Sequence, residues 1–102
     1  MNSVTHVVLV DWKPAISDAE VRRIRGWAQS FDTEIPGVIR VAEGPSRSPE
    51  GLENGFDYAL VIDFADAASR DGYLTHPAHL PLARALHEGA QRLVVFDIHN
   101  QE

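Results

Sequence analysis

Several segments of this chain carry the β-branched and aromatic residues of strands and are apolar on both faces. Residues 56–64 place large apolar side chains at alternate positions with Ala59 and Val61 between them, and residues 93–96 include no polar side chain. An antiparallel sheet with one side in water would instead alternate apolar and polar residues. Both faces of this sheet therefore need a cover, and this requirement limits the folds that the chain can adopt.

The rest of the sequence predicts where the other strands and the helices lie. Residues 4–12 alternate as a strand does, and the capping box formed by Ser17 and Glu20 starts an amphipathic helix. Pro and Gly residues mark 44–55 as a loop, and Asp66 can cap a further helix. The expected elements are strands over 4–12, 38–42, 56–64 and 91–98, a helix of about 15 residues from 17, a short helix after 66, and a second helical stretch after 77.

This β, α, β, β, α, β order is the ferredoxin-like arrangement, an α+β fold with a four-stranded antiparallel sheet. A chain of 102 residues supports one domain, which we place over residues 1–102. The helices of one chain can cover one face of the sheet. The other face is covered most economically by the same face of a second copy, so we predict a homodimer through the sheet face.

Composition excludes several classes of partner and chemistry. The formal net charge is −6 and no run of Lys or Arg occurs, which argues against nucleic acid and against a membrane surface as partners. Arg22, Arg23 and Arg25 are expected to form the solvated face of one helix. The chain has no Cys, which excludes disulfides and thiolate catalysis and fits a reducing compartment. With neither a signal peptide nor an apolar run of membrane-spanning length in the sequence, we expect a cytoplasmic protein.

Tyr73, His76 and His79 place a phenol and two imidazoles around Pro77. Imidazole titrates near neutral pH, so it can accept or donate a proton. Pro77 is expected to start a helix, with His76 at its boundary and His79 on its first turn. His6 interrupts the apolar row of the first strand, and a ferredoxin-like sheet could bring it beside Tyr73 and His79. These three side chains are the candidates for one proton-transfer cavity.

Each candidate also has a structural explanation. His6 could be hydrogen-bonded within the core, and Tyr73 could be a packed aromatic side chain with its hydroxyl at the surface. His76 is better explained as a helix-capping residue, while His87 and His99 are expected at the surface.

Metal binding and nucleophilic catalysis are the chemical alternatives. His76 and His79 with a carboxylate could hold zinc or iron, but the spacing is weakly diagnostic and no His-Glu-x-x-His motif occurs. A Gly-x-Ser-x-Gly elbow is missing as well. The residue types therefore favour proton transfer over metal-dependent or nucleophilic chemistry.

Six motifs carry a family resemblance that extends over residues 6–97. They are THVVL at 5–9, IPGV at 35–38, SPEGL at 48–52, GFDY at 55–58, YLTHPAH at 73–79 and VVFD at 94–97. With these motifs the chain resembles the stress-responsive α/β-barrel family, known as Dabb domains. The resemblance implies a ferredoxin-like domain that dimerises into an α+β barrel, in agreement with the strands that are apolar on both faces.

The resemblance also implies a candidate activity. Cyclases similar to olivetolic acid cyclase fold a linear polyketide thioester and catalyse an intramolecular aldol condensation without metal or cofactor. By this resemblance His79 is the base, Tyr73 holds or protonates the oxygen of the enolate, and His6 orients the substrate.

Substrate contacts are expected from Val8, from Trp27 on the first helix, and from Tyr58, which stands where the cyclase type has a histidine. Two other functions stay open: a stress-associated barrel that binds a small molecule without catalysis, and a cofactor-independent monooxygenase.

Overall fold

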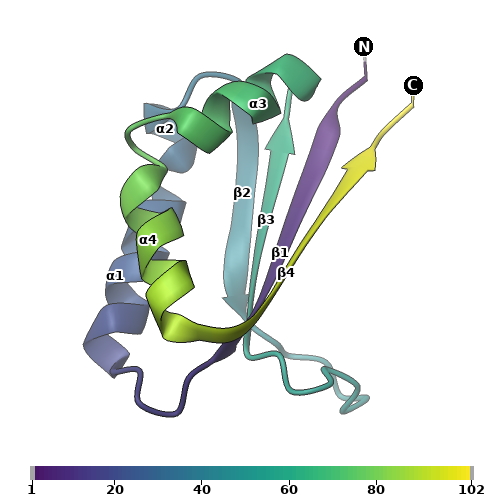
Figure 1. Ribbon diagram of the computed structural model, residues 1–102. Helices are drawn as coiled ribbons and strands as arrows, with labels where there is room; N and C mark the ends of the chain where they lie inside the picture. The colour runs from purple at the N-terminus through teal and green to yellow at the C-terminus, as the bar shows by residue number, and fades with distance from the viewer. Residues whose placement is uncertain (1, 102) are drawn as a thin grey trace.

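The computed structural model describes residues 2–101 and has the predicted ferredoxin-like order, with the first predicted helix divided in two (Figure 1). The four strands form one antiparallel sheet in the order β2-β3-β1-β4. The elements are β1 (Val4–Trp12), α1 (Asp18–Gln29), α2 (Phe31–Glu34), β2 (Val38–Pro45), β3 (Tyr58–Phe64), α3 (Ala67–Thr75), α4 (Leu80–Gly89) and β4 (Ala90–His99).

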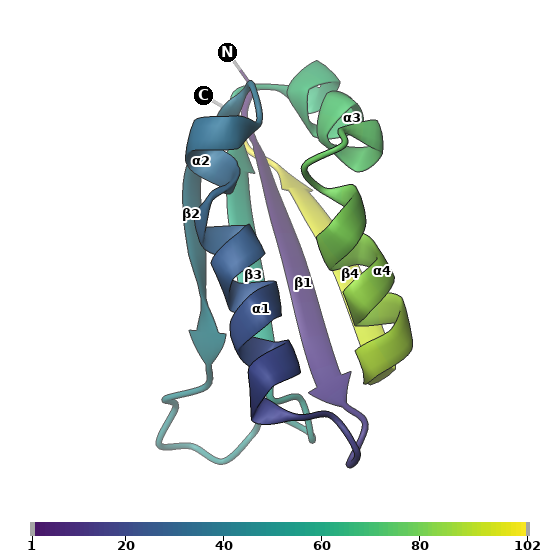
Figure 2. The same cartoon turned by 90° about the vertical axis from the view of Figure 1, so that its left-hand side faces the viewer.

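All four helices cover the same face of the sheet. In Figure 2 they lie in front of the strands, with α1 and α2 toward β2 and with α3 and α4 toward β4. Side chains at alternate positions of the two central strands are buried beneath them, including Val8 and Val10 of β1 and Leu60 and Ile62 of β3. The core therefore lies between the helices and this helix-covered face.

Local signals in the sequence fix where the helices begin. The Glu20 backbone N–H donates to the Ser17 hydroxyl oxygen at 3.1 Å, and the Glu20 carboxylate accepts from the Ser17 backbone N–H at 3.4 Å, which completes the predicted capping box. The Ser69 backbone N–H donates to the Asp66 carboxylate at 2.8 Å, so Asp66 caps α3 as predicted. Pro81 lies in the first turn of α4, where its missing N–H costs no intrahelical hydrogen bond.

The junction between α3 and α4 differs from the prediction. The helix was expected to restart at Pro77, but α4 begins at Leu80. Proline disfavours helical backbone in the preceding residue, and His76 is accordingly extended, with φ −67° and ψ 135°. A tight turn follows, closed by a 2.9 Å hydrogen bond from the His79 N–H to the His76 carbonyl. His79 therefore occupies the N-cap position of α4 instead of its first turn.

The loop between β2 and β3 lies slightly later than predicted. β2 continues to Pro45, past the expected end at Ala42, and β3 begins at Tyr58, so the loop covers residues 46–57. The sheet pairing of Gly44 and Pro45 with β3 holds these two residues in the strand despite their composition.

The face of the sheet opposite the helices, which we call the open face, is apolar along the middle of β1 and β4. In the β1–β4 register Val94 lies opposite Leu9 and Phe96 opposite Val7, and these side chains point away from the helices. Val94 and Phe96 are exposed in the single chain. The strands are thus apolar on both faces, and the helices of the chain cover one of them.

Gly37 provides a test of how the helix layer is held against β2. Its φ is +84°, and a Cβ atom there would overlap the side chain of Ser69 on α3. Gly37→Ala should lower the free energy of unfolding by about 2 kcal/mol, because left-handed backbone costs a side-chain-bearing residue roughly 1–2 kcal/mol and the contact with Ser69 adds to it. Chemical denaturation measures the change. The matched control is Gly26→Ala in α1, where a Cβ would meet nothing within 4 Å and stability should rise by about 0.5–1 kcal/mol. Equal stabilities for the two variants would contradict this account.

Candidate functional site

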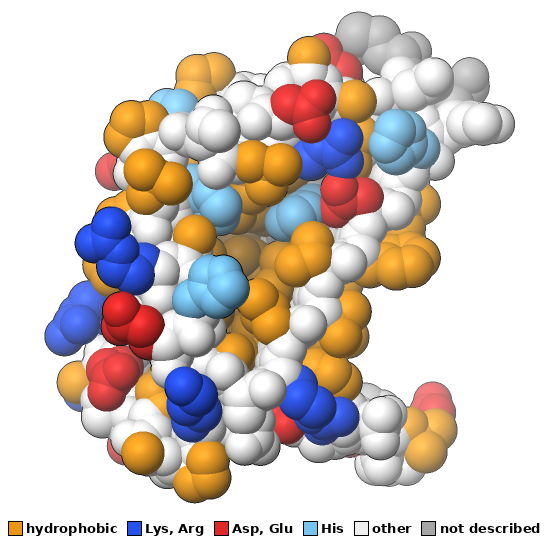
Figure 3. Space-filling view, viewed as in Figure 1, with side chains coloured by type: hydrophobic (Ala, Val, Ile, Leu, Met, Phe, Trp, Pro, Cys, Tyr) orange, Lys and Arg blue, Asp and Glu red, His pale blue; other side chains and the backbone are white. Residues whose placement is uncertain are grey.

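A cavity of about 170 Å³ lies between the α3–α4 layer and the β1–β4 half of the sheet, and it brings the three candidate side chains together. In Figure 3 this side of the molecule has a hollow with histidine and apolar side chains around it. His6 contributes from β1, Tyr73 from α3 and His79 from the turn before α4. The remaining lining residues are Val8, Leu74, Leu82, Ala83, Leu86, His87, Leu93 and Val95.

His79 and Tyr73 form a stacked pair in the wall of the cavity. Their ring centroids are 4.0 Å apart and the ring planes are inclined by 34°. His79 Nδ1 lies 3.3 Å from the Leu74 carbonyl oxygen. A carbonyl can only accept, so Nδ1 carries a proton in this contact and Nε2 is left for a ligand.

Burial governs the protonation of both groups. It lowers the pKa of His79, an effect that the Leu74 carbonyl opposes and the neighbouring His6 reinforces, so His79 is neutral at neutral pH. Burial raises the pKa of Tyr73, which keeps its phenol protonated. The cavity thus contains a neutral imidazole beside a hydroxyl that can donate.

His6 has a different partner, the carboxylate of Asp97. The two residues are directly opposite in the β1–β4 register, and His6 Nδ1 lies 2.6 Å from Asp97 Oδ1. Asp97 Oδ2 accepts from Arg70 Nη1 at 2.5 Å. Burial acts to raise the pKa of Asp97, but the hydrogen bonds from His6 and Arg70 outweigh it, and the pKa lies below its ordinary value. Asp97 is therefore a carboxylate, and the proton of the contact is on His6 Nδ1.

Sequence reasoning named neither Asp97 nor Arg70 as a site residue. A signal for Asp97 exists in the sequence, since it is a charged residue that ends the apolar run of the last strand. Arg70 offers no such signal, because a single arginine in a short helix is ordinary and only the packing of α3 brings it to Asp97.

The other histidines lie outside this arrangement. His76 Nδ1 accepts a hydrogen bond from the Ala78 backbone N–H at 3.0 Å, in agreement with its explanation as a capping residue, although it ends α3 instead of starting α4. His87 and His99 are exposed as expected, and His87 also borders the cavity.

Of the three expected substrate contacts, Val8 lines the cavity whereas Tyr58 and Trp27 lie elsewhere. Ile62 is opposite His6 and Tyr58 is opposite Val10. This separation places Tyr58 about 13 Å along the strand from the level of His6.

Both side chains are engaged in other packing. The Tyr58 hydroxyl donates to Glu43 at 2.9 Å and its ring packs 5.5 Å from that of Trp12. Trp27 is half-buried against the core from α1.

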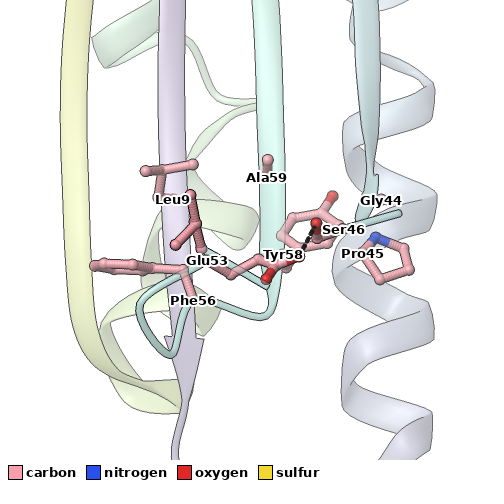
Figure 4. A pocket seen from close by; sticks show the side chains of 9 residues that line it. Leu9, Gly44, Pro45, Ser46, Glu53, Phe56, Tyr58 and Ala59 are labelled. Carbon is pink, nitrogen blue, oxygen red and sulfur yellow. Dashed lines mark hydrogen bonds between the residues drawn. The ribbon is translucent and has the colours of Figure 1, made fainter. Parts of the chain in front are cut away.

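Tyr58 instead borders a larger hollow of about 310 Å³ on the open face, under the 46–57 loop (Figure 4). Its polar lining includes Ser46 and Glu53, which are hydrogen-bonded to each other. No imidazole lines this hollow. We therefore assign the candidate chemistry to the cavity lined by His6, Tyr73 and His79, although its volume is smaller.

Within residues 2–101, no group of three or more His, Cys, Asp or Glu side chains is arranged to hold a metal ion. None of the helices in this part of the chain has the length and apolar character needed to cross a membrane.

The fold and the cavity define a ferredoxin-like protein whose helix-covered face holds acid–base side chains. The chain belongs to the stress responsive A/B barrel domain (Dabb) family, whose model matches residues 4–100, so the resemblance seen in the sequence is confirmed. Among characterised proteins it is similar to olivetolic acid cyclase of Cannabis sativa, with 21% identity over 95 residues that cover 93% of this chain and 94% of the cyclase.

Solved structures share the fold at similarly low identity. Hydroxynitrile lyase from Passiflora edulis has a TM-score of 0.87 at 20% identity, covering 98% of this chain and 94% of the lyase. A dimeric ferredoxin-like protein of unknown function from Jannaschia sp. CCS1 has a TM-score of 0.85 at 21% identity, covering 94% and 97%. SnoaB, a cofactor-independent oxygenase from Streptomyces nogalater, has a TM-score of 0.76 at 19% identity, covering 100% and 96%.

The lowered pKa of His79 predicts a pH dependence of stability. Because the folded pKa lies below the ordinary value of 6.5, the unfolded chain binds a proton that the folded chain does not as pH falls below about 6.5. The His79 contribution therefore decreases the free energy of unfolding upon acidification through this window. His79→Asn should lose less stability than the unaltered chain between pH 7 and 5 in urea titrations. Parallel curves for the two proteins would contradict the assignment.

Proposed function

We propose that this protein is a cofactor-independent acid–base enzyme, a lyase or cyclase that acts on a polyketide-like or other β-dicarbonyl substrate by an intramolecular aldol reaction. One observation carries the proposal: His79, Tyr73 and His6 line one cavity, and the two imidazoles each have Nδ1 engaged so that Nε2 is left for a ligand. The cyclase and the lyase among the similar proteins support the class of reaction.

Each side chain has a role that its surroundings favour. His79, neutral because of burial, removes a proton from the carbon next to a carbonyl group. The Tyr73 hydroxyl donates to the oxygen that becomes the enolate. His6 Nε2 accepts a hydrogen bond from a substrate hydroxyl or enol and so orients the chain.

The reaction then balances without an external reagent. The enolate carbon attacks a second carbonyl carbon of the same substrate and forms the new carbon–carbon bond. The resulting alkoxide takes the proton that His79 had removed, so His79 returns to its neutral form. The apolar lining from Leu82, Leu86 and Leu93 suits a hydrocarbon part of the substrate.

The test compares turnover of poly-β-keto thioesters by the unaltered chain and by His79→Ala. We expect the variant to lose about 10²- to 10⁴-fold in kcat, the usual contribution of a general base. His99→Ala, an exposed histidine outside the cavity, is the matched control and should retain full turnover. Equal rates for His79→Ala and the unaltered chain would remove His79 from the mechanism.

A barrel that only binds a small molecule, the main alternative, makes a different prediction. The unaltered chain would then saturate with a β-dicarbonyl ligand in a binding titration but would not consume it. A cofactor-independent oxygenase, the class of SnoaB, would consume oxygen together with the substrate, which an oxygen electrode detects.

We also propose that two copies of the chain pack through their open faces. Val94, Phe96 and Ile98 of β4 are exposed there beside the apolar residues of β1. A contiguous apolar face of this kind is rare on a monomer. Several similar structures are described as dimeric, which supports the proposal.

Phe96→Asp tests this interface, because Phe96 is 62% exposed in the single chain and its replacement leaves the core intact. Analytical ultracentrifugation at micromolar concentration should give a dimer for the unaltered chain and a monomer near 11.3 kDa for the variant. The control Leu80→Asp removes a Leu that is 48% exposed at the start of α4, on the helix side, and should stay dimeric. A monomer for the unaltered chain would contradict the proposal.

A further inference from the structure

The carboxylate of Asp97 is held by two partners at once. Oδ1 lies 2.6 Å from His6 Nδ1 and Oδ2 lies 2.5 Å from Arg70 Nη1. The Arg70 side chain is 19% exposed, and its Nε donates to Asp71 Oδ1 at 2.9 Å. A chain of contacts therefore runs from Asp71 on the surface of α3 through Arg70 and Asp97 to His6 in the cavity.

Packing alone does not fix the Asp97 carboxylate. Asp97 lies on β4, an edge strand, and its side chain is 23% exposed. The preceding residue on the same face, Val95, is also exposed. An aspartate in such surroundings can rotate its carboxylate toward water, so a second hydrogen-bond partner is needed to hold one orientation.

We propose that Arg70 is a positioning residue that fixes Asp97 with Oδ1 against His6, and so keeps a proton on His6 Nδ1 and selects the tautomer in which Nε2 is free toward the cavity. Arginine suits this task because its guanidinium is always charged and presents several donors in a rigid plane. Two of these donors are used here, one for Asp97 and one for Asp71, and this second contact anchors the guanidinium.

The tautomer of His6 decides whether the ring presents a hydrogen-bond donor or an acceptor to the cavity. Of the two neutral tautomers of His6, the one with Nδ1 protonated presents an acceptor to a ligand and the other presents a donor. With Asp97 held by Arg70, the position next to His6 selects a ligand group that donates, such as a hydroxyl or an enol O–H. The functional importance of this selection rests on the proposed acid–base enzyme, whereas the tautomer itself does not.

Nitrogen-15 NMR of the labelled full-length chain tests the proposal without any substrate. In the unaltered chain near neutral pH, the His6 ring should show a protonated Nδ1, an unprotonated Nε2 and an Nδ1–H signal that exchanges slowly with water. Arg70→Met removes the charge and the donors but keeps an unbranched apolar stem, and the single tautomer and its slow Nδ1–H signal should be lost. His6→Gln assigns the signals.

Arg40→Met is the matched control. Arg40 pairs with Asp63 at 3.4 Å on the open face and is 73% exposed, so this variant removes the same charge away from the cavity. It should leave the His6 signals unchanged. If Arg70→Met kept the same single tautomer and the same slow Nδ1–H exchange as the unaltered chain, the proposal would be overturned.

Arg70→Lys keeps the test decisive if the Met variant fails to fold. Lysine keeps the positive charge but presents it as a point charge without the planar set of donors, so the His6 tautomer should be only partly retained. Full retention of both signals would overturn the role of the planar guanidinium.

The outcome of this test can be distinguished from the outcome for the proposed enzyme. Normal turnover by His79→Ala together with loss of the His6 tautomer in Arg70→Met would reject the enzyme and keep the positioning role. Lost turnover by His79→Ala together with an unchanged His6 tautomer in Arg70→Met would keep the enzyme and reject the positioning role.

Discussion

The register between β1 and β4 is the constraint on which the candidate site depends. It sets His6 directly opposite Asp97, and side chains in such cross-strand pairs lie close enough to interact. A slip of one residue would turn every side chain of the slipped strand to the other face of the sheet and separate this pair. The backbone pairing of β1 with β4 therefore decides whether the His6 and Asp97 side chains can meet.

Hydrogen bonds hold this register at both ends of the strand pair. At one end the Asn100 side chain donates to the Thr5 hydroxyl at 2.8 Å. At the other end Arg92 Nε donates to Asp11 at 2.8 Å, next to the irregular pairing between Asp11 and Trp12. Because both ends are held, the His6–Asp97 pair, which lies between them and next to Thr5, cannot shift without breaking side-chain contacts.

The two buried tyrosines, Tyr58 and Tyr73, differ in whether their hydroxyl groups are already hydrogen-bonded within the protein. The Tyr58 hydroxyl donates to Glu43, whose carboxylate also accepts two hydrogen bonds from Arg25, at 2.8 and 3.1 Å. This network ties α1 to β2 and uses the donor of Tyr58. Tyr73 stacks on His79 and has no carboxylate partner among the hydrogen bonds of residues 2–101, so its donor stays available in the cavity.

Much of this architecture could be predicted from the sequence. Alternation gave the bounds of β1, the capping residues Ser17 and Asp66 gave the helix starts, and apolar residues on both faces of the strands anticipated the exposed sheet face. These features depend on residues close together in the sequence, so periodicity and capping residues are enough to predict them.

What could not be predicted depends on contacts between distant segments. The β2–β3 register and the packing of α1 together bring Glu43 to the Tyr58 hydroxyl, and no local pattern encodes this contact. The placement of Arg70 against Asp97 depends in the same way on the packing of α3 against the sheet. Tyr73 and His79 of the family motif do line one cavity with His6, but the polar network behind His6 required the three-dimensional arrangement.

β4 links the cavity to the open face. Its residues alternate, so that Leu93 and Val95 line the cavity while Val94 and Phe96 lie on the open face. As an edge strand it pairs within the chain with β1 alone. Covering the open face with a second copy would order the same strand that carries Asp97, because a strand packed on one face loses freedom on both. The proposed dimer would therefore stabilise the strand that also contributes Leu93, Val95 and Asp97 to the surroundings of the cavity.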